Sequence, residues 1–243
     1  MNSLAPILLA LGTFVSTMLG GLTGLRYRKQ LQRLLGFTAG VVIGVVAFDL
    51  LPEIFRSLGH GITDREAMVA LVVGFLAFHV VEKSILIHQS QEQEYEVHHH
   101  PHVGIASALA LAGHSFLDGL GIGLGFQAGT AVGVAVAIAV IAHDFSDGLN
   151  TVTLMLVNQN NRRRAFMMLW VDALAPLVGA IVGSRLHISD AGLTLYLGFF
   201  AGFLLYIGAS EILPEAHSKH SSYLTILLTV LGVAFMFAVT HFA

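Results

Sequence analysis

Eight apolar runs, each long enough to cross a lipid bilayer, recur along the 243-residue sequence and restrict what it can fold into. Crossing about 30 Å of hydrocarbon takes about 20 helical residues. The composition agrees, because 55% of the residues are hydrophobic, 11% are charged and the mean hydropathy is +0.77. We therefore expect an all-α, polytopic membrane protein, with residues 1–243 forming a single transmembrane domain. The predicted spans are 4–25, 34–58, 67–87, 103–126, 130–157, 165–186, 192–214 and 223–242.

The composition also excludes several kinds of partner. The formal net charge is only −3 and basic residues are few, which argues against nucleic-acid binding. Cysteine is absent, so disulfides and thiolate metal sites are excluded. The lipid bilayer is the expected surrounding, and any metal has to be bound by His, Asp, Glu or weaker oxygen ligands.

The distribution of Lys and Arg predicts the orientation, because these residues favour cytoplasmic loops. Nine of the 12 basic residues fall on one side of the predicted membrane and three on the other. The three are Arg56, Arg65 and Arg185. With eight spans, both termini are expected outside the cytoplasm of a cell-membrane protein, and the polar, His-containing loop 88–102 is expected inside.

An internal repeat relates two distant spans. "LGFTAGVVIGVVAFDLLPE" (35–53) aligns without a gap on "LGFFAGFLLYIGASEILPE" (197–215), with nine of nineteen positions identical and Asp49 opposite Glu211. A fainter match of "LAP" at 4–6 and 174–176 extends the pairing. The two segments run in opposite directions through the membrane. We expect an inverted repeat of helices 1–3 and 6–8 around central helices 4 and 5, a plan typical of secondary transporters.

The central helices carry two related polar motifs inside apolar sequence. They are "HSFLDGL" at 114–120 and "HDFSDGL" at 143–149. Residues four apart share a helix face, so His114 and Asp118 point the same way, as do His143 and Asp147. An ionisable group facing lipid costs about 2.5 to 3.5 kcal/mol, which favours a shared site inside the bundle.

Imidazole and carboxylate ligands together suit zinc and other first-row divalent ions. Asp144 adds a carboxylate on the second motif, and Ser115 holds the matching place on the first as a weaker oxygen. These residues could form a neighbouring metal position. The alternative is that the His and Asp side chains only hydrogen-bond the two helices to one another.

With these motifs the chain resembles the ZIP family of divalent metal transporters over nearly its whole length. The resemblance implies that the two His–Asp pairs form the primary transport site and that Asp144 belongs to a secondary one. It also implies that Glu211, in "SEILPE" at 210–215, lies on the cytoplasmic exit path, that transport is inward and that the protein is a homodimer.

The chain departs from the family pattern at several positions. Asp replaces the commoner Glu in both motifs, and Leu117 and Ser146 stand where many members have proline. Ala175 stands where the family often has a Glu before a proline. Asp172, three residues earlier and on nearly the same helical face, is the candidate substitute ligand.

The leading prediction is a carrier of zinc, with iron, manganese or cadmium as further candidates, in which the metal is the transported substrate and no separate cofactor is expected. Two alternatives stay open. One is an intramembrane zinc hydrolase, although no His-Glu-x-x-His motif is present. The other is a proton-coupled carrier of an organic substrate that uses His and Asp as a relay. The loop 88–102 either holds metal loosely or serves as a connector.

Overall fold

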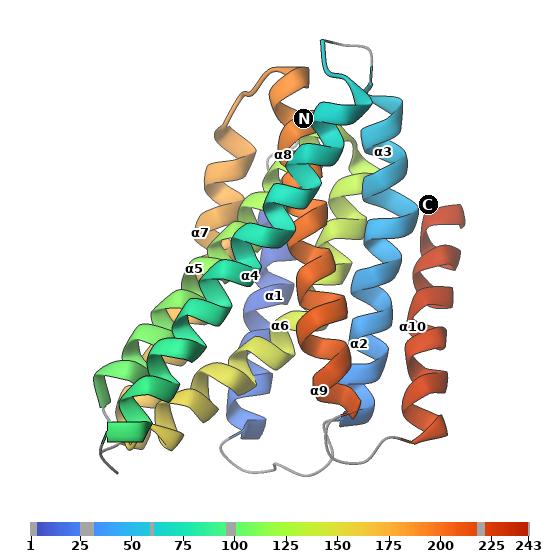
Figure 1. Ribbon diagram of the computed structural model, residues 1–243. Coiled ribbons are helices and arrows are strands. Elements are labelled where there is room, and N and C mark those ends of the chain that lie inside the picture. The colour runs from blue at the N-terminus through green and yellow to red at the C-terminus, as the bar shows by residue number, and fades with distance from the viewer. Residues whose placement is uncertain (1–3, 25–31, 59–60, 96–100, 218–221, 243) are drawn as a thin grey trace.

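The computed structural model describes residues 4–24, 32–58, 61–95, 101–217 and 222–242, and all regular structure in these ranges is helical (Figure 1). The elements are α1 (Leu4–Gly24), α2 (Gln32–Val45), η1 (Val46–Leu50), α3 (Leu51–Arg56), α4 (Asp64–Tyr95), α5 (Pro101–Ala128), α6 (Thr130–Val157), α7 (Arg162–Arg185), α8 (Asp190–Tyr206), η2 (Ile207–Ile212), α9 (Leu213–His217) and α10 (Tyr223–Phe242).

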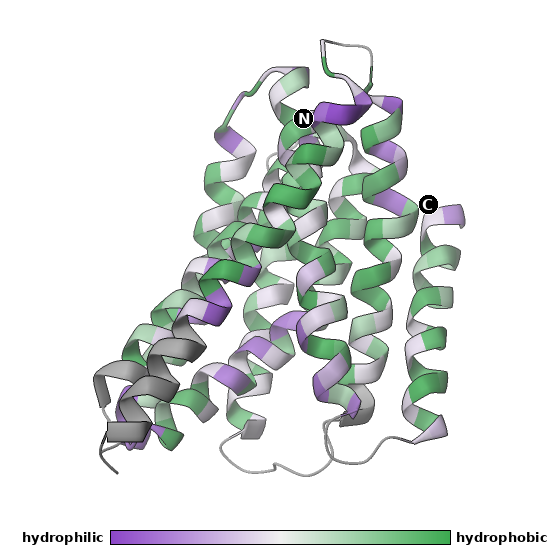
Figure 2. Ribbon diagram, viewed as in Figure 1, coloured by the Kyte–Doolittle hydropathy of each residue, from purple (hydrophilic) through white to green (hydrophobic). Residues whose placement is uncertain are grey.

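The prediction of an all-α protein with eight spans is confirmed. In the described part of the chain, eight helical stretches are long and apolar enough to cross a membrane. Two of them are composite, since α2, η1 and α3 run on as one rod, as do α8, η2 and α9. Large apolar side chains are exposed on the outer faces of α1, α4 and α10. Such faces suit contact with lipid, and Figure 2 shows the apolar colouring along the length of the bundle.

The segment 88–102, expected as a loop, is largely taken up by the helices on either side. The third span was predicted to end at residue 87, but α4 continues to Tyr95, and α5 begins at Pro101. The sequence "HQSQEQEY" at 88–95 is polar yet contains good helix formers, so the helix extends beyond its apolar part. Residues 96–100 lie outside the described residues.

Glycine residues set how closely the helices approach. The pairs α1/α6, α5/α7, α2/α10 and α4/α8 are among the most extensive contacts of the molecule. In each pair a glycine on either helix faces a backbone carbonyl of the other, and a Cβ there would collide with the carbonyl oxygen. The facing residues are Gly20 and Phe145, Gly148 and Thr17, Gly119 and Pro176, Gly179 and Phe116, Gly40 and Thr229, Gly232 and Phe37, Gly74 and Phe199, and Gly202 and Leu71.

The contacts divide the bundle into two groups of helices. We call α1, α5, α6 and α7 the central body, because these four pack closely on one another. The flanking body comprises α2, η1, α3, α4, α8, η2, α9 and α10. Contacts between the bodies are sparser, and α2 with α6 is the largest of them. The helices α5 and α6, which carry the two motifs, therefore belong to the same body. The helices of the flanking body lie alongside it.

The helices α1 and α7 pack on α6 and α5, respectively. The contacts align α1 with α7 in a register different from that of the "LAP" match. Gly20 and Gly24 of α1 meet α6 at Phe145 and Leu149, whereas Gly179 and Gly183 of α7 meet α5 at Phe116 and Leu120. Since the two α5 residues match the two α6 residues in the repeated motif, the glycines of α1 and α7 correspond. This register is eleven positions away from the one that "LAP" suggested.

A π-helical turn occurs in both of the aligned segments 35–53 and 197–215. η1 contains Asp49, and η2 contains Glu211, the residue aligned with it. A π turn widens the helix locally and is common at functional sites. The two segments thus share a local distortion that residue identity alone did not predict, and each distortion contains one of the two aligned acidic residues.

Candidate metal centre

Two half-sites are presented by neighbouring helices of the central body. His114 and Asp118 lie one turn apart on α5, and His143 and Asp147 lie one turn apart on α6. All four side chains are buried. Because α5 and α6 pack against each other, the two faces meet inside the bundle.

Four donor atoms converge where the half-sites meet. The Nε2 atom of His114 lies 3.2 Å from Oδ2 of Asp118 and 3.6 Å from Oδ2 of Asp147. The Nε2 atom of His143 lies 3.5 Å and 3.7 Å from the same two oxygens. Zinc bonds of about 2.0 to 2.2 Å in a tetrahedron require ligand atoms about 3.4 Å apart. The four nitrogen–oxygen separations are therefore close to four of the six edges of a tetrahedral zinc site.

The same atoms lack hydrogen-bond partners. Among the described residues, no partner satisfies Nε2 of either histidine, either carboxylate oxygen of Asp118, or Oδ2 of Asp147. Buried polar atoms without partners are costly, and several acceptors directed at one point favour a cation. The four residues also form a group whose ligand atoms all lie within 4.8 Å of one another.

The two histidines are held in different ways. Nδ1 of His143 lies 2.9 Å from the Ala139 carbonyl oxygen, to which it can donate, leaving Nε2 free to bind a metal. The His114 ring packs against both Phe78 and Phe203, with ring centroids 4.9 and 4.8 Å away. His143 is therefore oriented by a hydrogen bond within its own helix, and His114 by aromatic rings of the flanking body.

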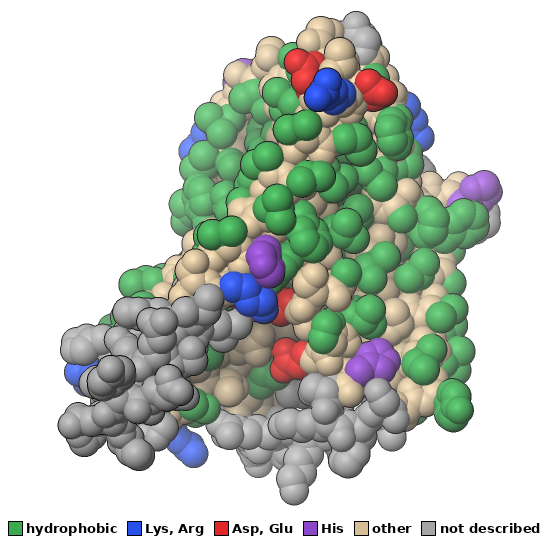
Figure 3. All heavy atoms as spheres, viewed as in Figure 1, with side chains coloured by type: hydrophobic (Ala, Val, Ile, Leu, Met, Phe, Trp, Pro, Cys, Tyr) green, Lys and Arg blue, Asp and Glu red, His purple; other side chains and the backbone are tan. Residues whose placement is uncertain are grey.

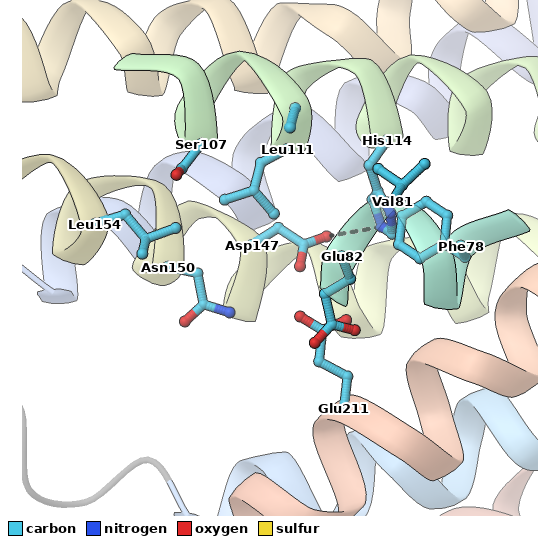
Figure 4. A pocket seen from close by; sticks show the side chains of 11 residues that line it. Phe78, Val81, Glu82, Ser107, Leu111, His114, Asp147, Asn150, Leu154 and Glu211 are labelled. Atoms are coloured by element: carbon cyan, nitrogen blue, oxygen red, sulfur yellow. Dashed lines mark ion pairs between the residues drawn. The ribbon is translucent and has the colours of Figure 1, made fainter. Parts of the chain in front are cut away.

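A cavity of about 240 Å³ leads to one side of this centre. His114 and Asp147 line it, together with Asn150 of α6 and with Glu82 and Glu211 of the flanking body. Figure 4 shows the Glu82 and Glu211 carboxylates close together beside His114 and Asp147. In the space-filling view, acidic side chains border a recess in the lower part of the molecule (Figure 3). Glu211 thus lines the cavity next to the metal centre, and its place on a cytoplasmic exit path stays a prediction.

The remaining predicted ligands have other partners. Asp144 Oδ1 lies 3.8 Å from Nε2 of His143, and Oδ2 accepts a 3.3 Å hydrogen bond from Thr17 of α1. Ser115 donates to Asp172 Oδ1 at 2.7 Å, and Thr151 donates to Asp172 Oδ2 at 2.7 Å. The structure brings these residues close to the four-donor group, but it pairs Ser115 and Asp172 with each other.

Several residues of the site were not identified from the sequence. Thr17, Thr151 and Asn150 are polar residues within apolar helices, a signal shared by many threonines that only bond their own backbone. Glu82 belongs to none of the motifs recognised in the sequence. Its nearness to Glu211 depends on the packing of α4 against α8, which local sequence does not reveal.

Eight helices that could cross a membrane, and a buried group of two imidazoles and two carboxylates beside a cavity, fit the class of membrane transporters of divalent metal ions. Residues 87–240 match the sequence profile of the ZIP zinc transporter family. The chain therefore belongs to the ZIP zinc transporter family.

Individual relatives agree with this assignment. The zinc transporter ZupT of Chlorobium chlorochromatii is 27% identical, and that of Chlorobium luteolum 24% identical, each over 97% of this chain and 96% of the relative. The zinc transporter zipt-7.2 of Caenorhabditis elegans is 25% identical over 46% of this chain. That match spans 26% of the longer nematode protein. Because the relatives are named as transporters, the hydrolase alternative is not supported, and the chain is assigned as a transporter rather than an enzyme.

Proposed function

We propose that the protein carries Zn²⁺ across the cell membrane into the cytoplasm by way of the site formed by His114, Asp118, His143 and Asp147. The observation that carries the proposal is the convergence of four unpartnered donor atoms, with nitrogen–oxygen separations of 3.2 to 3.7 Å. Two carboxylates neutralise a divalent charge, and two imidazoles favour zinc over the hard cations Mg²⁺ and Ca²⁺. The zinc transporter names of the ZupT relatives support the same ion. Iron, manganese and cadmium are its expected competitors.

The division of the bundle into two bodies supports transport by alternating access. All four primary ligands belong to the central body, whereas Glu82 and Glu211 belong to the flanking body. Movement of the central body relative to the flanking body would carry the ion from one side to the other. The matched π turns and the matched glycine contacts support an inverted repeat, which is the arrangement that gives two opposite access states.

The two aligned acidic residues suggest the two ends of the path. Glu211 lines the cavity that reaches the site, and we assign it to release. Asp49 is buried on the corresponding π turn, and its Oδ2 atom has no partner among the described residues. We assign Asp49 to the opposite, external side. The excess of Lys and Arg in the predicted inner loops supports this direction.

Asp144 is proposed as an auxiliary carboxylate, since its Oδ1 atom is unpartnered and lies near His143. It would attract the ion and could hold a second one transiently. A homodimer remains part of the proposal on the ground of family resemblance.

The decisive experiment is zinc uptake into proteoliposomes by variants that keep side-chain size but remove charge. Asp118→Asn and Asp147→Asn should each abolish most of the uptake. Asp190→Asn is the matched control, because Asp190 is an exposed residue in the first turn of α8. Chromatographic profiles should show that all three variants are folded. Wild-type uptake by both site variants would contradict the shared-site proposal.

A further inference from the structure

The Asp172 carboxylate on α7 joins the two helices that carry the metal ligands. Its Oδ1 atom accepts a hydrogen bond from Ser115 of α5, and its Oδ2 atom accepts one from Thr151 of α6, both at 2.7 Å. All three side chains are fully buried. A single side chain of α7 therefore bridges α5 and α6 at the depth of the metal centre.

The two donors stand next to the metal ligands in the sequence. Ser115 directly follows His114, and Thr151 lies one helical turn after Asp147. A shift of α5 against α6 would disturb at least one of the two hydrogen bonds to Asp172. The bridge is thus suited to fixing the spacing of His114 and Asp147, which belong to different helices.

Asp172 is a poor candidate for a ligand in this arrangement. Both of its oxygens accept hydrogen bonds, in contrast to the oxygens of Asp118, which have no partner among the described residues. It is also absent from the group whose ligand atoms lie within 4.8 Å of one another. Metal binding by Asp172 would require at least one short, buried hydrogen bond to be given up.

A related contact on the other side of the central pair supports a role in helix spacing. Asp144 of α6, which matches Ser115 in the repeated motif, accepts a hydrogen bond from Thr17 of α1. Each central helix is therefore tied to an outer helix by a hydroxyl–carboxylate bond at the residue that follows its metal-binding histidine. The carboxylate is on α7 in one case and on α6 in the other.

We propose that Asp172 is a positioning residue that holds the α5 and α6 half-sites at the spacing required for the ion, and that it does not bind the ion itself. This inference rests on the proposed function, since it assumes that the ion binds between the half-sites. It assigns to Ser115 and Thr151 the same positioning role.

Conservative variants separate positioning from ligation. In Asp172→Asn, the amide oxygen can still accept from Thr151, and the amide NH₂ can donate to Ser115. The Ser115 hydroxyl can then donate to the Leu111 carbonyl oxygen, which already lies 3.1 Å away. Asp172→Asn should therefore keep hydrogen bonds to both Ser115 and Thr151, whereas Asp172→Ala loses both.

Cadmium binding to the purified protein measures the consequence. Asp172→Asn and Thr151→Ser should bind Cd²⁺ with near wild-type affinity, whereas Asp172→Ala and Thr151→Val should bind about tenfold more weakly or worse. The ¹¹³Cd chemical shift, which reports the ligand set, should be unchanged in Asp172→Asn. Weak binding by Asp172→Asn, or a changed chemical shift in that variant, would overturn the proposal and make Asp172 a ligand.

A measurement without metal keeps this test separate from that of the proposed function. The chain contains no cysteine, so spin labels can be attached at Leu109→Cys on α5 and Val157→Cys on α6, two exposed positions. The distance distribution should broaden in Thr151→Val and stay narrow in Thr151→Ser. An unchanged distribution in Thr151→Val and in Asp172→Ala would refute the positioning role. Failure of the wild-type protein to bind any divalent ion would instead refute the proposed function.

Discussion

Oδ2 of Asp118 on α5 lies 3.5 Å from Nε2 of His143 on α6, so the two halves of the metal centre meet across the helix pair. Neither atom has a hydrogen-bond partner among the described residues. The pair is arranged as two ligands of one ion would be, at a separation close to the edge of a zinc tetrahedron. This relationship makes the behaviour of the site toward protons, solvent and helix packing testable.

Metal binding should release protons, because the histidine ligands bind an ion only in their neutral form. Free histidine has a pKa of about 6.5, so zinc affinity should weaken as the pH falls through that region. Calorimetric titration with zinc in buffers of different ionisation enthalpy measures the protons released. The number of protons released per zinc ion bound should fall in His114→Ala and in His143→Ala. An unchanged count in both variants would remove these histidines from the ligand set.

Close packing of α1 on α6 should not tolerate a methyl group at Gly20. The Cβ of Gly20→Ala would collide with the carbonyl oxygen of Phe145, and overpacking typically costs about 1 to 3 kcal/mol. The midpoint of thermal unfolding in detergent should therefore fall. Gly113→Ala is the matched control, since Gly113 is an exposed helical glycine with nothing within 4 Å of its Cβ position. Equal midpoints for the two variants would argue against this packing.

Water should reach the cavity from the cytoplasmic side. Asn150 lines the cavity, so the Asn150→Cys variant should react with a membrane-impermeant maleimide added on the cytoplasmic side of sealed vesicles. Thr63→Cys, at an exposed position beside the start of α4, should react from the opposite side. Reaction of both variants from the same side would show that the assigned access is wrong.

The connection between α4 and α5 should be cytoplasmic. A protease site inserted between Tyr95 and Pro101 should be cut in inside-out vesicles and protected in right-side-out vesicles. A cleavage site at the external end of the bundle, after Leu58, provides the reversed control. If protection follows the opposite pattern, the orientation inferred from Lys and Arg is reversed, and Glu211 and Asp49 exchange their assigned ends of the path.

Much of the architecture could be predicted from the sequence because the bilayer imposes a local requirement. Each run of about 20 apolar residues must satisfy its backbone hydrogen bonds within itself, so α1, α5 or α6 is recognisable without knowledge of its neighbours. The pairing of His114 with Asp118 is local too, since a spacing of four residues places both on one helix face. The same argument holds for His143 and Asp147.

What the sequence could not decide depends on contacts between distant segments. Ser115 and Asp172 both looked like ligands, but the packing of α7 against α5 and α6 pairs them and adds Thr151. Glu82 became a neighbour of Glu211 only through the approach of α4 to α8. The register between neighbouring helices determines which potential ligand atoms are left without hydrogen-bond partners. The glycines that face backbone carbonyls set that register.

The sequence by itself therefore determined the number of spans and the two local half-sites, because helix periodicity and the thickness of the bilayer act over a few turns of one chain segment. Tertiary structure alone decided that the half-sites converge at the spacing of a metal site. It also decided that both carboxylate oxygens of Asp172 accept hydrogen bonds from hydroxyl groups, and that a cavity reaches His114 and Asp147. These features arise from the close approach of helices far apart in the sequence, and no local pattern encodes that approach.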